Sequence, residues 1–418
     1  MKKIFMTAAA SAAAISLLFA GCTAQPGGGY SYFVQLDIAR TDLRVDGELV
    51  SVSEYRELME DLESLMNGLE EDFSVEFSDS DLSRVNAAVA GESVALSAET
   101  KKLFALAEDY SDLTGGKFSP ALYPLTTLWG FSPENAGRYG VSRAEPSESA
   151  LSSARALSDL SLFSVEEGCA TKKADGAMLD FGGIAKGYMC DRAVKYLRSR
   201  FEGQEIDAIV NVSSSNTALL GKKREEGGVS RGYNVGIDNP RALTTGVGTG
   251  LYLVGLSDVS VTTSADNYRC YVYGGKIYPH IIDPETGKPA DRGIISVTIV
   301  VPNDGYLYSG ALADALSTAA FCMPLTRSLA FLQELSDEWE GFGAVVITED
   351  FKYYGVGGVN VMNRTEYAAY CNEILGTDYD LSAIEDVFEK GDVSSAVDEV
   401  QPCEEERIYI ARLEELSG

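Results

Sequence analysis

The spacing of apolar residues changes along this 418-residue chain, and that change constrains the fold more than any other feature of the sequence. Between Ser51 and Leu69 apolar side chains recur at steps of three and four, which predicts an amphipathic helix that ends near Gly68. The same period predicts two further helices, over residues 97–113 and 185–200.

Other segments carry short apolar runs bounded by turn residues, which is the pattern of strands. An alternating segment from Tyr271 to Tyr278, interrupted by Gly274 and Gly275, predicts a hairpin. Because the predicted helices and strands alternate irregularly, we expect an α+β fold with a mixed sheet-and-helix architecture, rather than a regular strand–helix–strand repeat. The predicted strands are 208–212, 251–256, 297–301 and 344–347.

Charge and residue counts exclude several classes of protein. The 34 basic and 63 acidic residues give a net charge of −29, which repels nucleic-acid phosphate, so we expect no nucleic-acid binding. The chain has one histidine, His280, which excludes a zinc site built from several histidines. Beyond the N-terminus no apolar stretch approaches the length of about 18 residues that a membrane span needs.

Residues 1–21 have the pattern of a bacterial export signal, in which two lysines precede an apolar run. The residues just before Cys22 resemble the lipobox of bacterial lipoproteins, whose cysteine becomes lipidated. We therefore expect a lipid anchor at Cys22 on the extracytoplasmic face of the cell membrane, followed by a glycine-rich tether over residues 22–35. An uncleaved membrane anchor is the alternative interpretation.

The six other cysteines are scattered singly, without a Cys-x-x-Cys pair, so neither a zinc ribbon nor a thioredoxin-like motif is supported. An exported chain can form disulfides, although buried free thiols are the favoured interpretation. Residues 363–418 are rich in acidic side chains and are expected to be an appendage, whose last part, 404–416, has the pattern of a solvated helix.

A glycine turn between a predicted strand and a predicted helix is a candidate anion site. Residues 179–188 read LDFGGIAKGY, so that backbone N–H groups at the helix start, together with Lys186, would face an anion. The spacing matches neither a dinucleotide-binding GxGxxG motif nor a Walker A motif. A turn chosen only for tight packing explains the pattern equally well.

Two later segments carry further candidate residues. If the segment ADALST at 313–318 is helical, Asp314 and Thr318 lie one turn apart and could share a magnesium ion. Such pairs are also common on solvated helix faces. His280 begins a proline-bracketed loop, HIIDPETGKP, in which a neutral imidazole could accept a hydroxyl proton.

These three segments, in this order, resemble the ApbE family of FAD:protein FMN transferases. Further motifs of that family are also present, DLSRVN at 81–86, TGGKF at 114–118 and LWGF at 128–131. The resemblance covers residues 36–362 and implies an ApbE-like α+β fold for this domain. It also implies FAD as the substrate, Mg²⁺ as the cofactor and an acceptor flavoprotein as the partner.

The resemblance assigns residues to the nucleotide. Asp180 and Lys186 would contact FAD, Phe118 and Ser119 would lie along its flavin nucleotide, and Ile282 would lie near it.

The resemblance also assigns the cation and the proton. The Gly183 carbonyl would join Asp314 and Thr318 around Mg²⁺. His280 would take the proton from a Thr or Ser hydroxyl of the acceptor, and this oxygen would attack the FMN-side phosphorus and release AMP.

Three positions depart from the family pattern. Ser119 stands where the family often has Asp, Ser213 and Ser214 replace two glycines after a strand, and Glu76 replaces an expected aromatic residue. The magnesium and phosphate residues match, so these departures concern the flavin pocket more than the reaction.

Two other functions are compatible with the same residues. An FAD pyrophosphatase would use water as the acceptor and yield FMN and AMP. A non-catalytic flavin-binding lipoprotein would bind without turnover, but mere binding needs no proton acceptor such as His280.

Overall fold

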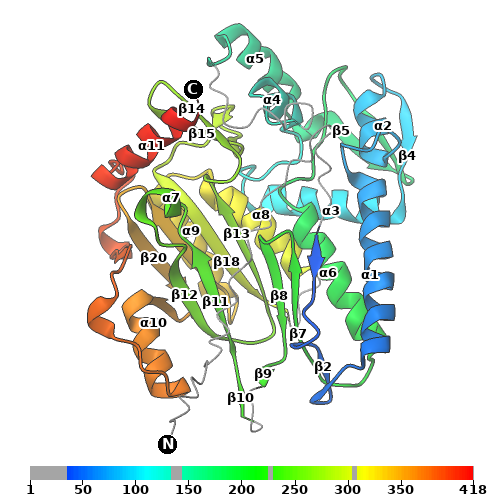
Figure 1. Cartoon of the computed structure of the whole chain (residues 1–418). Helices are drawn as coiled ribbons and strands as arrows, with labels where there is room; N and C mark the ends of the chain where they lie inside the picture. The colour runs from blue at the N-terminus through cyan, green and yellow to red at the C-terminus, as the bar shows by residue number, and fades with distance from the viewer. Residues whose placement is uncertain (1–34, 133–143, 225–228, 304–307, 418) are drawn as a thin grey trace, which may run out of the picture.

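The fold is built around one large sheet, seen at the centre of Figure 1. The computed structural model describes residues 35–132, 144–224, 229–303 and 308–417. The predicted export signal, Cys22 and nearly all of the predicted tether lie outside the described residues. Within the described ranges no helix is both long and apolar enough to cross a membrane.

The central sheet has ten strands in the order β22-β20-β19-β18-β13-β8-β7-β2-β3, with β1 also paired to β7. All neighbours are antiparallel except β20 and β22, which are parallel. The strands are β1 (Leu36–Asp37), β2 (Arg44–Val45), β3 (Glu48–Leu49), β7 (Ile206–Val212), β8 (Asn216–Leu220), β13 (Val259–Ala265), β18 (Ile294–Pro302), β19 (Gly343–Thr348), β20 (Lys352–Gly357) and β22 (Glu389–Lys390).

Both faces of this sheet are covered, which explains why β19 carries a continuous apolar run instead of alternating apolar and polar residues. Every residue of β19 is buried. Ala344 and Val346 belong to the core on the helical side, whereas Val345 and Ile347 belong to a second core on the opposite side. The continuous apolar runs in the sequence are therefore strands between two cores.

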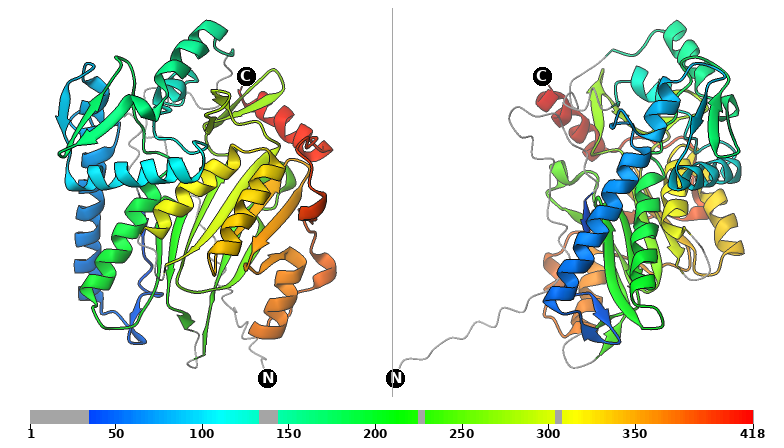
Figure 2. Two further views of the ribbon diagram at one scale, coloured as in Figure 1. Left: turned by 180° about the vertical axis from the view of Figure 1, so that it is seen from behind. Right: turned by 90° about the vertical axis from the view of Figure 1, so that its right-hand side faces the viewer.

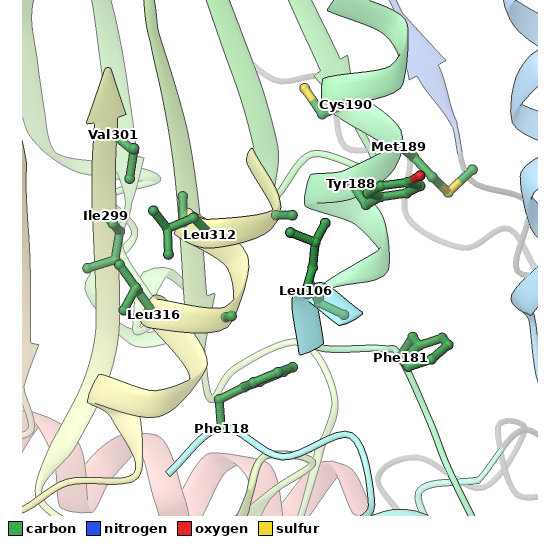
Figure 3. Close-up of a cluster of buried hydrophobic side chains, with 14 of the residues drawn as sticks. Leu106, Phe118, Phe181, Tyr188, Met189, Cys190, Ile299, Val301, Leu312 and Leu316 are labelled. Atoms are coloured by element: carbon green, nitrogen blue, oxygen red, sulfur yellow. The ribbon is translucent and has the colours of Figure 1, made fainter. Parts of the chain in front are cut away.

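Helices α6 (Ala185–Arg200), α8 (Ser309–Phe321) and α9 (Leu325–Glu338) cover one face, and α1 (Val52–Phe73) and α3 (Ala98–Leu113) pack against them (Figures 1 and 2). Leu312 and Leu316 of α8 lie beside Ile299 of β18 (Figure 3). Helix α8 is buried along nearly its whole length, so its few polar side chains are held inside the protein.

The opposite face is covered by a three-stranded sheet of β11 (Tyr233–Asp238), β12 (Thr249–Leu256) and β21 (Val361–Asn363). Smaller sheets pair β4 (Ser93–Ala95) and β5 (Phe163–Glu166) with β6 (Cys169–Lys172), β9 (Lys223–Arg224) with β10 (Ser230–Arg231), β14 (Cys270–Tyr273) with β15 (Lys276–Pro279), and β16 (Ile282–Asp283) with β17 (Lys288–Pro289). The remaining helices are α2 (Asp81–Ala87), α4 (Tyr123–Leu128), α5 (Glu148–Leu157), α7 (Ala242–Thr245), α10 (Arg364–Tyr370) and α11 (Glu404–Ser417).

The structure confirms the predicted α+β class and the predicted helices, strands and hairpin, with one correction. Helix α1 was expected to end near Gly68 but continues to Phe73. Gly68 has open space around its Cα and no left-handed backbone, so it does not stop the helix. Leu69 and Phe73 extend the buried stripe. The hairpin turn does use Gly274 and Gly275, both with positive φ.

The acidic segment after residue 362 packs onto the domain, unlike the expected appendage. Strand β22 adds to the edge of the large sheet, and Phe388 is only 2% exposed. Helix α11 is present where a solvated helix was expected, but its Glu406 and Tyr409 are buried. Among the described residues no two cysteines form a disulfide.

Candidate active site

The strand end before the glycine turn is held by a side chain from the DLSRVN motif. Asn86 donates its amide to the carbonyl of Leu179 at 2.8 Å and accepts the N–H of Leu179 at 2.7 Å. This amide therefore pairs with Leu179 as a neighbouring strand would. The DLSRVN motif, distant in sequence, thereby fixes the residue just before Asp180.

The glycine turn itself is joined to the TGGKF segment. Asp180 donates its backbone N–H to the carbonyl of Pro120 at 2.8 Å, and its side chain accepts the N–H of Gly182 at 2.8 Å. A methyl group added to Gly183 would lie 3.3 Å from the Phe118 ring and 3.5 Å from Thr318 Oγ1. Gly183 is thus the point where three of the motifs meet.

Helices α6 and α8 are in direct backbone contact at Gly187 and Gly310. A methyl group added to Gly187 would collide with the carbonyl oxygen of Gly310, so only glycine fits there. Asp191 accepts the N–H groups of Gly310 and Ala311, both at 2.8 Å, and so holds the start of α8 against α6. The Gly187 N–H donates to Asp314 Oδ2 at 3.1 Å, which orients that carboxylate.

Asp314, Thr318 and Gly183 fit the predicted magnesium site by their chemistry. Asp314 is 4% exposed, and this burial raises the pKa of its carboxyl, although Lys186, the Gly187 N–H and Asn216 act in the opposite direction. Because burial of an ionised carboxylate is costly, a cation beside it would stabilise its charged form.

The donor set also suits magnesium rather than a metal that prefers sulfur or nitrogen. The described residues contain no group of three or more His, Cys, Asp or Glu side chains that could hold a metal. One carboxylate with neutral oxygens leaves coordination positions for substrate phosphates, as Mg²⁺ prefers.

His280 lies at the start of the proline-bracketed loop, with part of its surface exposed. Its Nδ1 lies 3.1 Å from the carbonyl oxygen of Arg269, and its backbone N–H donates to the same oxygen at 2.8 Å. Because a carbonyl oxygen only accepts, Nδ1 carries the proton and Nε2 holds the lone pair. Burial and the charges of Arg269 and Lys186 hold the pKa of His280 well below its ordinary value, so the imidazole is neutral.

The loop after His280 is fixed by the LWGF motif and by an ion pair. Trp129 Nε1 donates to the carbonyl of Gly287 at 2.8 Å. The buried Asp283 accepts from Arg292 Nε at 3.0 Å, and its side chain also caps the N–H of Glu285 at 2.9 Å. Each short motif in the sequence therefore positions a longer one.

The residues that the resemblance assigns to the FAD nucleotide differ in their exposure to solvent. Phe118 and Ile282 are 3% and 4% exposed, with Ile282 in an aromatic cluster that contains Trp129. Ser119 and Lys186 are half-buried, and Lys186 Nζ donates to the carbonyl of Gly182 at 3.4 Å.

The departures from the family pattern have structural counterparts. Ser213 and Ser214, between β7 and β8, have φ values of 51° and 59°, the left-handed region that favours glycine. Glu76 follows α1 and is exposed, with the exposed aromatic Phe77 next to it.

Sequence reasoning missed three polar residues near the site. The Arg269 charge acts on both Asp180 and His280, Ser264 Oγ lies 3.5 Å from Thr318 Oγ1, and the Asn216 side chain acts to lower the pKa of Asp314. Each lies on or beside a strand in a sequence without a motif. Only strand pairing brings them to the helices, so no local signal marked them.

Comparisons with known proteins identify the family to which a chain with this fold belongs. The model of the ApbE family matches residues 37–342. This chain belongs to the ApbE family.

Curated relatives and solved structures agree with this membership. The chain is 29% identical over 318 residues to an FAD:protein FMN transferase of Treponema pallidum, covering 73% of this chain and 81% of that protein. It is 28% identical to one from Vibrio cholerae, covering 67% and 77%. The apo flavinyl transferase ApbE of Pseudomonas stutzeri superposes with a TM-score of 0.60 at 25% identity, covering 83% of this chain and 98% of that one. The ApbE protein of Thermotoga maritima has a TM-score of 0.61 at 27% identity, covering 81% and 99%.

Proposed function

We propose that this chain is an Mg²⁺-dependent FAD:protein FMN transferase that moves FMN from FAD to a Thr or Ser hydroxyl of an acceptor flavoprotein. The observation that carries the proposal is the convergence at Gly183 of the turn after Asp180, the Phe118 segment and Thr318 on α8. The names of the curated relatives support the enzyme class.

The chemistry follows from the state of His280. Its Nε2 takes the proton of the acceptor hydroxyl, and the oxygen then attacks the FMN-side phosphorus of FAD. A new oxygen–phosphorus bond forms, the bond to the bridging oxygen of the pyrophosphate breaks, and AMP leaves with that bonding electron pair. A neutral imidazole with a low pKa suits this task because it is unprotonated at neutral pH.

Several positive charges would act on the phosphates of FAD. Lys186 and Arg269 both act electrostatically on Asp180 and on His280, and would attract the pyrophosphate to the same place. The Gly183 carbonyl, Asp314 and Thr318 would hold Mg²⁺, which supplies the positive charge that neutralises the pyrophosphate. Asp314 is pre-oriented for this by the Gly187 N–H.

The decisive experiment separates transfer from its alternatives. Residues 22–418 are incubated with FAD, Mg²⁺ and a candidate acceptor domain, and the acceptor mass and released AMP are measured. Equal amounts of AMP and of acceptor gaining one FMN support the transferase. AMP with free FMN and an unmodified acceptor identifies a pyrophosphatase. Bound FAD with no AMP in the presence of several acceptors identifies a flavin-binding protein.

The N-terminal sequence supports a second proposal, that the protein is a lipoprotein on the extracytoplasmic face of the cell membrane. The apolar run before Cys22 carries this proposal. We expect wild-type protein from bacterial membranes to begin at a diacylglyceryl-modified Cys22 in mass spectra. The Cys22→Ser variant should lack the lipid, and a wild-type protein without the diacylglyceryl mass would refute the lipid anchor.

A further inference from the structure

A buried ion cluster connects the C-terminal helix to the loop beside His280. The guanidinium of Arg241, with no exposed surface, donates to both carboxylate oxygens of Asp266 at 2.7 and 2.8 Å. It also donates to both oxygens of Glu406 on α11, from Nη2 at 2.7 Å and from Nε. One arginine therefore holds two carboxylates from distant parts of the chain, each in a bidentate pair.

Helix α11 is seated around this cluster. It packs against β14 and α7, and the ring of its Tyr409 lies 4.4 Å from the guanidinium carbon of Arg241. Figure 1 shows α11 beside the β14–β15 hairpin. The hairpin leads directly into His280, so α11 contacts the element that immediately precedes the proposed base.

The loop between Asp266 and β14 connects the ion cluster to His280. Asp266, three residues before Arg269, is fixed by Arg241, and Tyr268 donates its hydroxyl to Asp238 at 3.1 Å. The Arg269 carbonyl then accepts the two His280 hydrogen bonds described above. A shift of Asp266 would therefore move the oxygen that selects the tautomer of His280.

We propose that Glu406 is a positioning residue for His280, acting through Arg241 and Asp266 on the Arg269 carbonyl. The inference rests on the proposed function in one respect, that His280 Nε2 is the proton acceptor. Glu406 lies outside the matched family region of residues 37–342, so the family motifs do not supply this support.

A purely structural role explains the cluster less well. The C-terminal segment is also held by strand β22, by the buried Phe388 and by Asp398, which accepts the N–H and hydroxyl of Thr326. Buried ion pairs are poor stabilisers because both partners lose their hydration. What the cluster adds is a fixed geometry at the Asp266 loop.

The test uses the fact that His280 is the only histidine. In full-length protein without a histidine tag, ¹⁵N-labelled histidine gives one imidazole, whose two nitrogen shifts report the tautomer directly. Glu406→Ala, Glu406→Gln and Glu406→Asp are compared with Glu404→Gln, which removes a charge from an exposed position of the same helix. The transfer rate, KM for FAD and thermal unfolding midpoint are measured for each variant.

We expect wild type and Glu404→Gln to show a protonated Nδ1 and a bare Nε2. Glu406→Ala should shift the signals toward a mixture of tautomers and lower kcat about tenfold, with KM for FAD within about twofold, since misplacing a catalytic group costs rate before binding. Glu406→Asp should restore part of both effects. If Glu406→Ala is too unstable to measure, Glu406→Gln provides the same comparison with a smaller change.

Unchanged nitrogen shifts and unchanged kcat in folded Glu406→Gln and Glu406→Ala would overturn the proposal. So would a wild-type imidazole that is protonated on Nε2. If wild type transfers no FMN, the proposed reaction fails, but the nitrogen shifts still decide whether Glu406 positions the imidazole.

Discussion

The two helices at the glycine turn and the C-terminal segment both pack against the same sheet, but they are held by different means. Around Gly183 and Gly187 the contacts run between backbones, and they require particular residue types at particular positions. The C-terminal segment docks through separated side chains such as Phe388 and Glu406. Backbone contacts leave a recognisable motif in a sequence, whereas docking by single side chains does not.

The comparison predicts that changes near the glycine turn remove chemistry, while loss of an apolar docking side chain of the C-terminal segment, such as Phe388, mainly removes stability. Asp314→Ala should lower magnesium-dependent transfer by at least about 10³-fold, because it deletes the only charged group among the proposed ligands. The free energy of unfolding should change much less than in Phe388→Ala, since loss of the hydrogen bond from the Gly187 N–H is offset by removal of a carboxylate whose charge is costly to bury. Transfer assays across Mg²⁺ concentrations and denaturant unfolding measure both. The exposed Asp109→Ala is the control, and full activity of Asp314→Ala at micromolar Mg²⁺ would refute the metal assignment.

His280→Ala is a second test of the catalytic region. Transfer should fall by about 10²–10⁴-fold, the usual contribution of a positioned proton acceptor. FAD binding, followed by flavin fluorescence, should persist because the phosphate contacts remain. A wild-type transfer rate in this variant would assign the proton to another group while leaving the transferase proposal intact.

Phe388→Ala tests the C-terminal segment. Removing this side chain, which packs against Phe351 in the second core, should destabilise the protein by about 3–5 kcal/mol. The kcat of the molecules that remain folded should be unchanged. Leu381→Ala, at a position 38% exposed in the same segment, is the matched control and should change unfolding little. A large loss of kcat at full folding would remove the distinction between the two regions.

The pH dependence provides a smaller effect at the glycine turn. Because the pKa of His280 is lowered, kcat/KM should be constant near neutral pH and should decrease only below about pH 6.5, the ordinary imidazole pKa. Because the Lys186 charge contributes to this lowering, Lys186→Gln should move the acid limb toward higher pH. Rate profiles between pH 5 and 8, set beside the imidazole titration, check the shift. An acid limb above pH 6.5 in wild type would contradict the lowered pKa of His280.

The smallest effect concerns the turn between β7 and β8. Ser214→Gly should stabilise the protein by about 1 kcal/mol, because it relieves a left-handed backbone in an exposed residue. Ser213→Gly should gain less, since the Ser213 hydroxyl accepts the Gln35 N–H at 3.3 Å and that bond would be lost. Denaturant unfolding of both variants measures the difference, and a loss of stability in Ser214→Gly would show that the side chain has another role.

Hydrophobic periodicity correctly predicted helices α1, α3 and α6, and short apolar runs correctly predicted strands β7, β12, β18 and β19. The predicted end of helix α1 near Gly68 was wrong. A glycine with open space around it does not stop a helix whose buried stripe continues. The motif resemblance predicted which segments form the site. It could not reveal Arg269, because its approach to His280 depends on a hairpin and a loop. It could not reveal Glu406 either, because one buried acid in an acidic segment has no distinctive pattern.

The pairing of Asn86 with Leu179 has a consequence for which substitutions the motif tolerates. The side chain must offer one donor and one acceptor at the spacing of a peptide group. Aspartate has no donor when ionised, glutamine is one methylene longer, and serine offers a single atom for two partners. In a library carrying all amino acids at position 86, selection for transfer should therefore retain asparagine almost alone.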